Sequence, residues 1–199
     1  MKPFRALTAR AAVLDRADVD TDQIIPKQFL KRIERTGYGE FLFFDWAKDA
    51  RFELNRPEYA GARILLTGRN FGCGSSREHA AWALQDAGFE AVVAPSFGDI
   101  FRTNSLKIGL LPVTLPAEDV RELMAAAADG PLTVDLEALQ VTDARGRDYA
   151  FELEPFAREC LLQGLDDVAL ALRHEDAIAA YERGHPAPLD TSKLVALSH

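Results

Sequence analysis

The sequence predicts an α/β protein with added antiparallel strands, folded as one domain, and three observations lead to this prediction. Between residues 63 and 115, three short apolar segments alternate with two helical segments, a pattern typical of parallel strands joined by right-handed crossovers. Around a turn at residues 143–146, apolar and polar residues alternate with period two, which indicates an antiparallel hairpin. The length of 199 residues, with 48% apolar and 27% charged side chains, fits one globular domain.

The first half of the chain contains the parallel strands and a long connection. A strand is expected at residues 11–14, before an acidic segment at 15–22. Residues 26–60 mix glycines and aromatics without a clear period. They predict a long loop with one helical turn, whose part from 27 to 55 we expect to be mobile. The next elements are expected as strands at 63–67, 91–94 and 110–115 and helices at 75–88, ended by Gly88, and 97–107.

The C-terminal part of the chain changes character. After an alanine-rich helix at 117–128, the hairpin is expected to join two apolar runs, Leu132, Val134, Leu136 and Tyr149, Phe151, Leu153. A helical stripe follows, formed by Leu161, Leu165, Val168 and Leu172. Residues 185–199 contain two prolines and are expected to form an extended tail, so that the single domain spans residues 1–199.

Charge and cysteine content exclude several classes of protein. The net charge is −8 and the pI is near 5.0, whereas nucleic-acid binders need a Lys/Arg excess on at least one face. No stretch reaches the roughly 18 consecutive apolar residues of a membrane span, and residues 1–5 lack the apolar core of a signal peptide. Cys73 and Cys160 are too few for a disulfide scaffold, a zinc ribbon or a self-contained iron–sulfur cluster. We therefore expect a cytoplasmic protein with no nucleic-acid or membrane partner.

The segment from Gly68 to His79 carries the clearest functional signal. An expected strand enters a turn containing Gly72 and Gly74, and the turn opens the expected helix. Glycines let the backbone present N–H groups outward, and a helix N-terminus adds about half a positive charge. Two hydroxyls and a guanidinium follow, from Ser75, Ser76 and Arg77. This inventory predicts a site for a carboxylate or a phosphate.

Other interpretations of this segment can be compared residue by residue. It lacks the lysine of a Walker loop, the third small residue of a dinucleotide fingerprint and the second glycine of a nucleophile elbow. Ser75 and Glu78 have the spacing of a helix capping box, and for this pair alone capping is the stronger interpretation. Capping does not account for Ser76, Arg77 and the two glycines, so for Arg77 we favour a bidentate clamp on a carboxylate.

Three acidic residues at spacing two form a second cluster. It lacks the glycine and the distal glutamate of an EF-hand loop, and we interpret Asp18 and Asp20 as part of a solvated turn. Asp22 lies between Thr21 and two isoleucines and is expected to point inward. Because a buried carboxylate needs a cation, we expect Asp22 to pair with Arg77.

These motifs together resemble one known family. The residues that carry the resemblance are the segments 20–26 (DTDQIIP), 68–84, 97–112 (FGDIFRTNSLKIGLLP) and 161–167 (LLQGLDD). In this order they resemble the small subunits of 3-isopropylmalate dehydratases (isopropylmalate isomerases), the separate-chain form of the aconitase swivelling domain. The Gly-Ser-Ser-Arg core alone would indicate only the aconitase superfamily.

The resemblance implies a fold, a partner and a reaction. The fold is a swivelling β/β/α domain, and the partner is a large subunit that forms a heterodimer with this chain. That subunit carries a [4Fe–4S] cluster, whose iron acts as the Lewis acid on the departing hydroxyl, so this chain holds no cofactor or metal. The reaction is that of a hydro-lyase of leucine biosynthesis, which removes water from 2-isopropylmalate and returns it with opposite regiochemistry.

The resemblance also implies roles for individual residues. Ser75 matches the catalytic base, whose pKa must be lowered by the N–H groups of the turn, the helix dipole and Arg77. Gly74, Ser76 and Arg77 match positions that bind substrate carboxylate, and Asp22 matches the acid that orients an arginine. Leu30, for apolar contact, and Lys31, for charge, are candidates for substrate selection in the long loop. Cys73 matches no cluster ligand and is interpreted as a packing residue.

Three alternatives remain open at this point. Within the superfamily, the substrate could be a homologous 2-hydroxy diacid, as in homoaconitase or in methylmalate and citraconate hydratases. The chain could instead be a non-catalytic module that binds a carboxylate. A stand-alone hydrolase that uses Ser75 and His79 would cleave esters without any partner.

Overall fold

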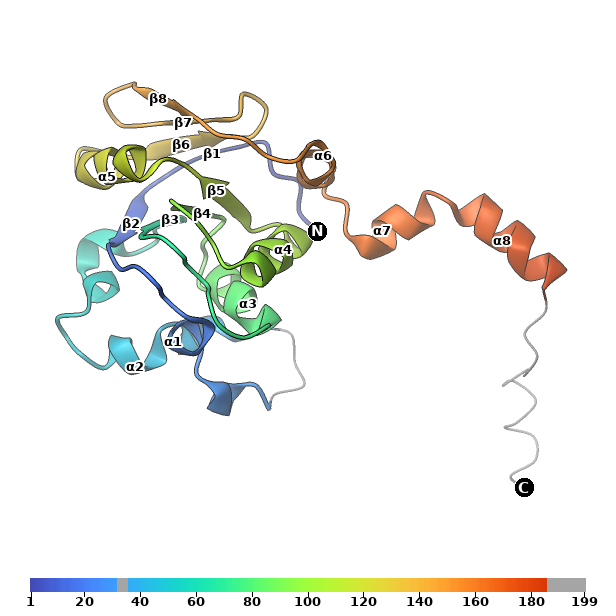
Figure 1. Ribbon diagram of the computed structural model, residues 1–199, viewed down its shortest axis with the longest axis horizontal. Helices are drawn as coiled ribbons and strands as arrows, with labels where there is room; N and C mark the ends of the chain where they lie inside the picture. Colours follow the sequence, from blue (N-terminus) through green and yellow to red (C-terminus); the bar gives the residue numbers. More distant parts are fainter. Residues whose placement is uncertain (32–35, 186–199) are drawn as a thin grey trace. The chain divides into compact units, whose positions relative to one another are not determined.

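The computed structural model describes residues 1–31 and 36–185, which belong to two compact units that meet in sequence after Leu165. The first unit contains a parallel and an antiparallel sheet of four strands each (Figure 1). The antiparallel sheet, the parallel sheet and a pair of helices lie one above another in both ribbon views. This β/β/α layering confirms the predicted fold class.

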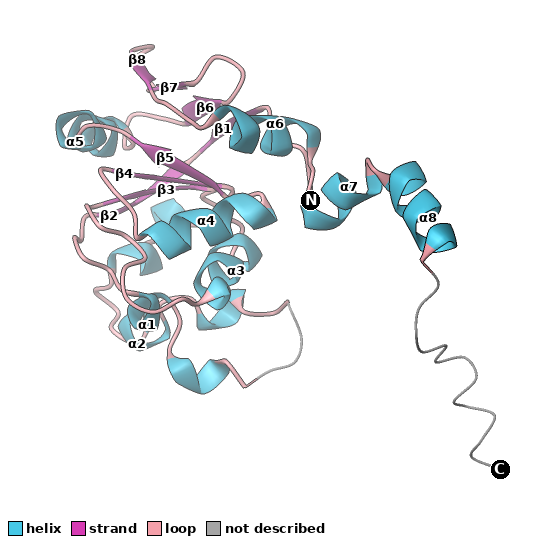
Figure 2. Ribbon diagram, turned by 45° about the vertical axis from the view of Figure 1, so that its right-hand side comes forward, coloured by secondary structure: helices cyan, strands magenta, loops and turns pink. Residues whose placement is uncertain are grey.

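The parallel sheet follows the expected alternation of strands and helices. Its order is β2-β3-β4-β5, with all neighbours parallel. The strands are β2 (Ala11–Leu14), β3 (Ile64–Thr67), β4 (Ala91–Ala94) and β5 (Leu111–Thr114), and the connecting helices are α3 (Glu78–Asp86) and α4 (Asp99–Ile108). Figure 2 shows α3 and α4 on one face of this sheet. Both inner strands are buried along their whole length, as expected for a sheet covered on both faces.

Each face of the parallel sheet buries its own apolar core. Leu66 and Val93 pack toward the antiparallel sheet with Val134, whereas Leu65 and Val92 belong to the core on the helical side. Successive strand residues point to opposite faces, so the continuous apolar runs of β3 and β4 supply both cores. This arrangement holds the carboxyl ends of the strands, where the functional loops begin, in fixed positions.

The antiparallel sheet differs from the expected hairpin. Its order is β1-β6-β7-β8, with strands β1 (Ala6–Ala9), β6 (Leu132–Asp135), β7 (Gln140–Thr142) and β8 (Asp148–Ala150). The turn at 143–146 joins β7 to β8 in an antiparallel pair, which confirms the predicted hairpin at this turn. Its first strand is β7 and not the apolar run Leu132, Val134, Leu136, so this part of the prediction was wrong. β7 has three residues and is too short to show a period, and β1 buries only Leu7. Neither β1 nor β7 was predicted.

The long connection before β3 is built from short helical turns rather than from loop alone. Five of them occur in its described residues: η1 (Lys27–Phe29), η2 (Gly39–Phe41), α2 (Phe44–Ala47), η3 (Glu53–Asn55) and η4 (Pro57–Tyr59). The expectation of one helical turn was wrong because aromatic contacts, not periodicity, stabilise these turns. Phe43 stacks on Trp46 and meets Phe52 edge-on. The predicted mobility of 27–55 stays a prediction, and residues 32–35 lie outside the described residues.

The C-terminal helices are more fragmented than predicted. The structure contains α5 (Ala117–Ala126), α6 (Pro155–Gln163), α7 (Asp167–Leu172) and α8 (Glu175–Gly184). The continuous stripe was a wrong prediction, because Gly164 ends α6 in a left-handed conformation, and only Leu161 of the stripe is buried, whereas Val168 and Leu172 are exposed. Of the expected tail, residues 186–199 lie outside the described part of the chain. None of the helices in the described residues is long and apolar enough to span a membrane.

Candidate active site

The turn after β3 depends on glycines that pack against the turn after β4. The Gly72 N–H donates to the Val19 carbonyl at 2.7 Å, and Gly72 has φ +72°. A Cβ on Gly72 would lie 2.2 Å from Phe101, and one on Gly98 would lie 2.5 Å from the Gly72 carbonyl oxygen. No side chain larger than hydrogen fits at either crossing. The two glycines therefore fix the path of the chain just before Ser75.

Ser75 and Ser76 lie in the turn and not in the helix that follows it. α3 begins at Glu78, and Arg77 precedes it without a side-chain cap. The prediction of a helix from residue 75, with a Ser75–Glu78 capping box, was therefore wrong. The Ser75 carbonyl instead accepts a hydrogen bond from the Arg77 N–H at 2.9 Å. Both serines are exposed, so the Ser75 hydroxyl is accessible and is not used to cap the helix.

The short helix α1 (Thr21–Ile24) lies against this turn. The Thr21 N–H donates to the Cys73 carbonyl at 2.9 Å. Thr21 is 2% exposed, and its hydroxyl donates to the Ser75 carbonyl at 3.3 Å and lies 3.5 Å from Ser75 Oγ. This contact of Thr21 was not predicted, because it joins residues 54 positions apart and no local pattern indicates it.

Arg77 and Asp22 form the expected ion pair between the turn and α1. The side chain of Arg77 is 16% exposed, but that of Asp22 is 55% exposed, so the prediction that Asp22 points inward was wrong. Arg77 Nη1 is buried and touches the carboxylate without completing a directional hydrogen bond. Contact with the Arg77 guanidinium lowers the pKa of Asp22, and the Lys27 N–H adds to this effect.

The other two acidic residues also have structural partners. Asp20 accepts a hydrogen bond from the Gln23 N–H at 2.8 Å and caps α1 in a reciprocal capping box. Asp18 has φ +56° and accepts hydrogen bonds from Asn70 at 2.9 Å and Arg69 at 3.2 Å. Asp18 lies exposed in a bend, as expected for a solvated turn, but the sequence did not predict that Asp18 and Asp20 also hold the segments that carry the candidate site.

The remaining candidates lie around this cluster or apart from it. Leu30 is half-buried and packs against the helical-side core, and Lys31 is exposed; their part in substrate selection stays a prediction. Cys73 is half-buried, and its burial, with Asp20 and Asp18 nearby, raises the pKa of its thiol. His79 packs against the rings of Tyr38 and Trp82, and burial lowers its pKa.

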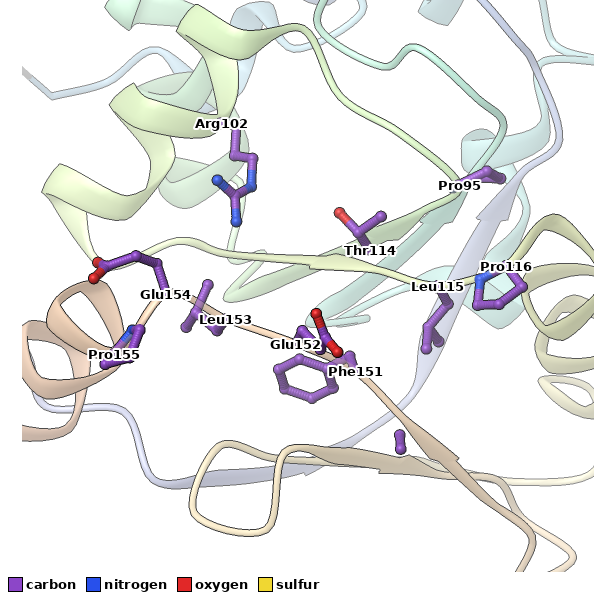
Figure 3. A pocket seen from close by; sticks show the side chains of 11 residues that line it. Pro95, Arg102, Thr114, Leu115, Pro116, Phe151, Glu152, Leu153, Glu154 and Pro155 are labelled. Atoms are coloured by element: carbon purple, nitrogen blue, oxygen red, sulfur yellow. The ribbon is translucent and has the colours of Figure 1, made fainter.

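A large groove lies elsewhere on the first unit, at the carboxyl ends of β4 and β5. Figure 3 shows its lining, which includes Arg102, Thr114 and Phe151. Its volume is about 930 Å³, and no residue of the 68–77 turn lines it. Ser75 and Asp22 are exposed, whereas the side chain of Arg77 is 16% exposed.

The chain combines a β/β/α fold with a serine at a glycine turn and a nearby arginine–carboxylate pair. Comparison with family models identifies the class of protein that has this combination. Residues 1–118 match the family model described as the aconitase C-terminal domain. Residues 121–155 match the model described as LeuD_N. The chain thus contains a domain of the aconitase C-terminal type.

Curated relatives narrow the class to one family. The 3-isopropylmalate dehydratase small subunits of Acidobacterium capsulatum and Geobacillus kaustophilus are 56% and 55% identical to this chain, over 93% and 94% of its length and 91% and 100% of theirs. A crystal structure of 3-isopropylmalate dehydratase (leuD) from Methanocaldococcus jannaschii matches with a TM-score of 0.66 at 27% identity, over 89% of this chain and 99% of that one. The chain belongs to the family of 3-isopropylmalate dehydratase small subunits.

Proposed function

We propose that this chain is the small subunit of a hydro-lyase that interconverts 2-isopropylmalate and 3-isopropylmalate in leucine biosynthesis, with Ser75 as the base. The observation that carries this assignment is the exposed hydroxyl of Ser75, held at the glycine turn beside the Asp22–Arg77 pair. Family membership supports the assignment of the reaction, and the geometry of the turn supports the choice of Ser75 as the base.

The base removes a proton from the carbon next to a substrate carboxylate. An unperturbed serine is too weak a base for this step at neutral pH, so its alkoxide must be stabilised. The positive charge of Arg77 and the N–H groups of the turn supply this stabilisation. The helix dipole contributes less than the sequence suggested, because Ser75 precedes the first residue of α3 and the effect falls off within a turn.

Substrate carboxylate is held by Gly74, Ser76 and Arg77. Gly74, in a left-handed conformation with φ +95°, presents its backbone to the surface, and the exposed Ser76 hydroxyl adds a donor. Arg77 contributes charge, and Asp22 fixes the orientation of its guanidinium through the ion pair. Leu30 and Lys31 then contact the isopropyl group and the distal carboxylate.

We place the [4Fe–4S] cluster, which assists departure of the hydroxyl, in a larger subunit that pairs with this chain. The donor set here does not fit a cluster: the sequence has two cysteines, and the described residues contain no group of three metal-ligating side chains. Relatives named as small subunits support a complex with a larger one. Both cysteines are free, which suits the reducing cytoplasm where we expect this complex.

Turnover by the complex reconstituted with its larger subunit tests the assignment. We expect Ser75→Ala to lower kcat for 2-isopropylmalate by at least about a hundredfold, because the general base is lost. Thr103→Ala, which removes an exposed hydroxyl from α4, serves as the control and should retain wild-type kcat. A Ser75→Ala complex with wild-type turnover would refute the assignment of Ser75 as the base.

Substrate choice is tested in the same complex with a series of 2-hydroxy diacids. One methylene in an apolar pocket is worth about 1–3 kcal/mol, so kcat/KM should fall about tenfold or more when the isopropyl group is shortened to methyl. A higher kcat/KM for methylmalate or homoaconitate would instead assign the chain to a related hydro-lyase.

A further inference from the structure

Thr21 is a buried hydroxyl residue with no role in the chemistry described above. It is 2% exposed, and its position is fixed by its own backbone. Its N–H donates to the Cys73 carbonyl at 2.9 Å, and its carbonyl accepts from the Ile25 N–H at 3.0 Å. The backbone of Thr21 is therefore held against the Ser75 turn, and its hydroxyl lies within 3.5 Å of Ser75.

The Thr21 hydroxyl has one proton and two acceptors within reach, both on Ser75. It donates to the Ser75 carbonyl at 3.3 Å, while Ser75 Oγ lies 3.5 Å away. Both distances are long for O–H donors, so neither acceptor binds the proton strongly while Ser75 is neutral. Hydrogen bonds to an ionised oxygen are shorter and about twice as strong. An alkoxide at Ser75 would therefore draw the proton of Thr21 toward Oγ.

We infer that Thr21 is a positioning residue that fixes the Ser75 turn and donates a hydrogen bond to Ser75 Oγ when that oxygen is negatively charged. This inference rests on the proposed role of Ser75 as the base. Thr21 would act through Ser75 only and would not touch the substrate.

The charges around Ser75 show why a neutral donor is suited to this position. Asp20 and Asp22 approach from α1, and Glu78 follows in α3; all three disfavour an anion at Oγ, and Arg77 is the opposing cation. The Asp22 carboxylate already neutralises part of the Arg77 charge. A buried hydroxyl adds stabilisation that solvent does not screen, without adding another charge that would need a partner.

A thiol at position 75 measures anion stabilisation directly in the full-length chain. We would compare Ser75→Cys alone with Ser75→Cys combined with Thr21→Val or with Thr21→Ser. The rate of alkylation at residue 75 is followed against pH by peptide mass spectrometry, which separates this thiol from Cys73 and Cys160. We expect Thr21→Val to raise the pKa of the introduced thiol by about one pH unit, equivalent to tenfold less thiolate, and Thr21→Ser to restore it. Equal thiol pKa values in all three proteins would overturn the inference.

The reconstituted enzyme supplies the second measurement. We expect Thr21→Val to lower kcat about tenfold or more with little change in KM, and to move the acidic limb of the kcat–pH profile upward, since the pKa of the base rises. Thr21→Ser should recover most of the loss. Should Thr21→Val fold poorly, Thr21→Ala tests the same loss of the hydroxyl.

The outcomes separate this inference from the proposed function. Wild-type kcat and pH profile in Thr21→Val, together with an inactive Ser75→Ala, would overturn the role of Thr21 and leave Ser75 as the base. An equal loss in Thr21→Val and Thr21→Ser, with an unshifted pH profile, would show a purely structural role and also overturn it. Wild-type turnover in Ser75→Ala would refute the proposed function, and the alkylation experiment would still decide whether Thr21 stabilises an anion at position 75.

Discussion

Asp22 and Arg77 connect the two segments that form the site. The pair joins α1 to the residue just before α3, and the half-exposed carboxylate gives the buried guanidinium a fixed orientation. In solvent such a pair contributes little to stability. We propose that its importance lies in presenting a cation to a substrate carboxylate in a defined geometry.

Replacing Asp22 by asparagine tests this orienting role. We expect Asp22→Asn to raise KM of the reconstituted complex about tenfold, because Arg77 loses the carboxylate of its ion pair. Stability should change by less than about 1 kcal/mol, since the carboxylate is half-exposed. Steady-state kinetics and urea unfolding at pH 7 measure the two effects, and an unchanged KM would contradict the role.

The same variant gives a pH dependence of known sign. Because Arg77 lowers the pKa of Asp22 in the folded chain, the unfolded chain binds more protons in the acid range. The contribution of the pair is therefore complete above about pH 4 and is lost as the pH falls through the lowered pKa. The stability difference between wild type and Asp22→Asn should therefore be constant above about pH 4 and shrink as the pH falls below this value.

At the residue scale, the pairing of Asp22 with Arg77 could be predicted from the sequence, but the exposure of Asp22 could not. A carboxylate and an arginine in two functional motifs indicated the Asp22–Arg77 pair. The exposure of Asp22 and the role of Thr21 depend on how α1 lies against the turn, which is a tertiary contact. The contacts of Asp18 with Arg69 and Asn70 were not predicted for the same reason, since these partners lie in the distant turn.

The two turns that follow β3 and β4 act as one structural element. Phe71 and Phe97 form an isolated parallel bridge, and Gly98 crosses the backbone of Gly72 with no space for a side chain. This close approach of the two backbones fixes the position of the Ser75 turn relative to the parallel sheet.

A single methyl group at this crossing should displace the turn. We expect Gly98→Ala to destabilise the chain by about 1–3 kcal/mol, because the added Cβ overlaps the Gly72 carbonyl oxygen, and to lower kcat of the complex. Gly130→Ala is a milder control, since its Cβ would meet only the side chain of Ala144, at 3.3 Å. Equal stability of the two variants in thermal unfolding would contradict this account of the crossing.

A second element-scale feature holds the long connection to the parallel sheet. Arg16, just after β2, makes two hydrogen bonds to Glu53, of 3.1 and 2.8 Å, and its guanidinium lies 4.3 Å from the ring centroid of Trp46 and 5.4 Å from that of Phe52. A bidentate ion pair with cation–π contacts exceeds an ordinary surface pair in strength.

Loss of this contact should loosen the connection. We expect Arg16→Ala to cost about 1–2 kcal/mol and to speed amide exchange in residues 44–55. Arg121→Ala removes an exposed arginine whose nearest carboxylate partner is 4.0 Å away, and it should change neither quantity. Unchanged exchange in Arg16→Ala would show that the aromatic cluster alone orders this segment.

Sequence patterns predicted the elements with a strong period and missed those fixed by side-chain contacts. The four strands of the parallel sheet and its helices α3 and α4 were expected, with limits differing by up to three residues. The short turns between Pro26 and Ala60 carry no period, because the contacts of Phe43, Trp46 and Phe52 order them. The start of α3 was misplaced because the Ser75 carbonyl bonds to the Arg77 N–H, which no spacing rule distinguishes from a cap.

At the scale of the whole molecule, three residues of the candidate site are exposed. The two cores fix the strands rigidly, while Ser75, Ser76 and Asp22 remain exposed above them. A reaction that must exclude water and assist a departing hydroxyl needs a second surface over this site. This need agrees with a family whose members are named as small subunits.

Solvent-deuterium incorporation tests the central claim most directly, because it reports the proton transfer itself. In D₂O, the complex with the larger subunit should place deuterium on the carbon beside the substrate carboxylate while it isomerises 2-isopropylmalate. With Ser75→Ala, we predict that incorporation and turnover fall together by at least about a hundredfold. Deuterium incorporation at the wild-type rate in Ser75→Ala would contradict the account and assign the proton to another group.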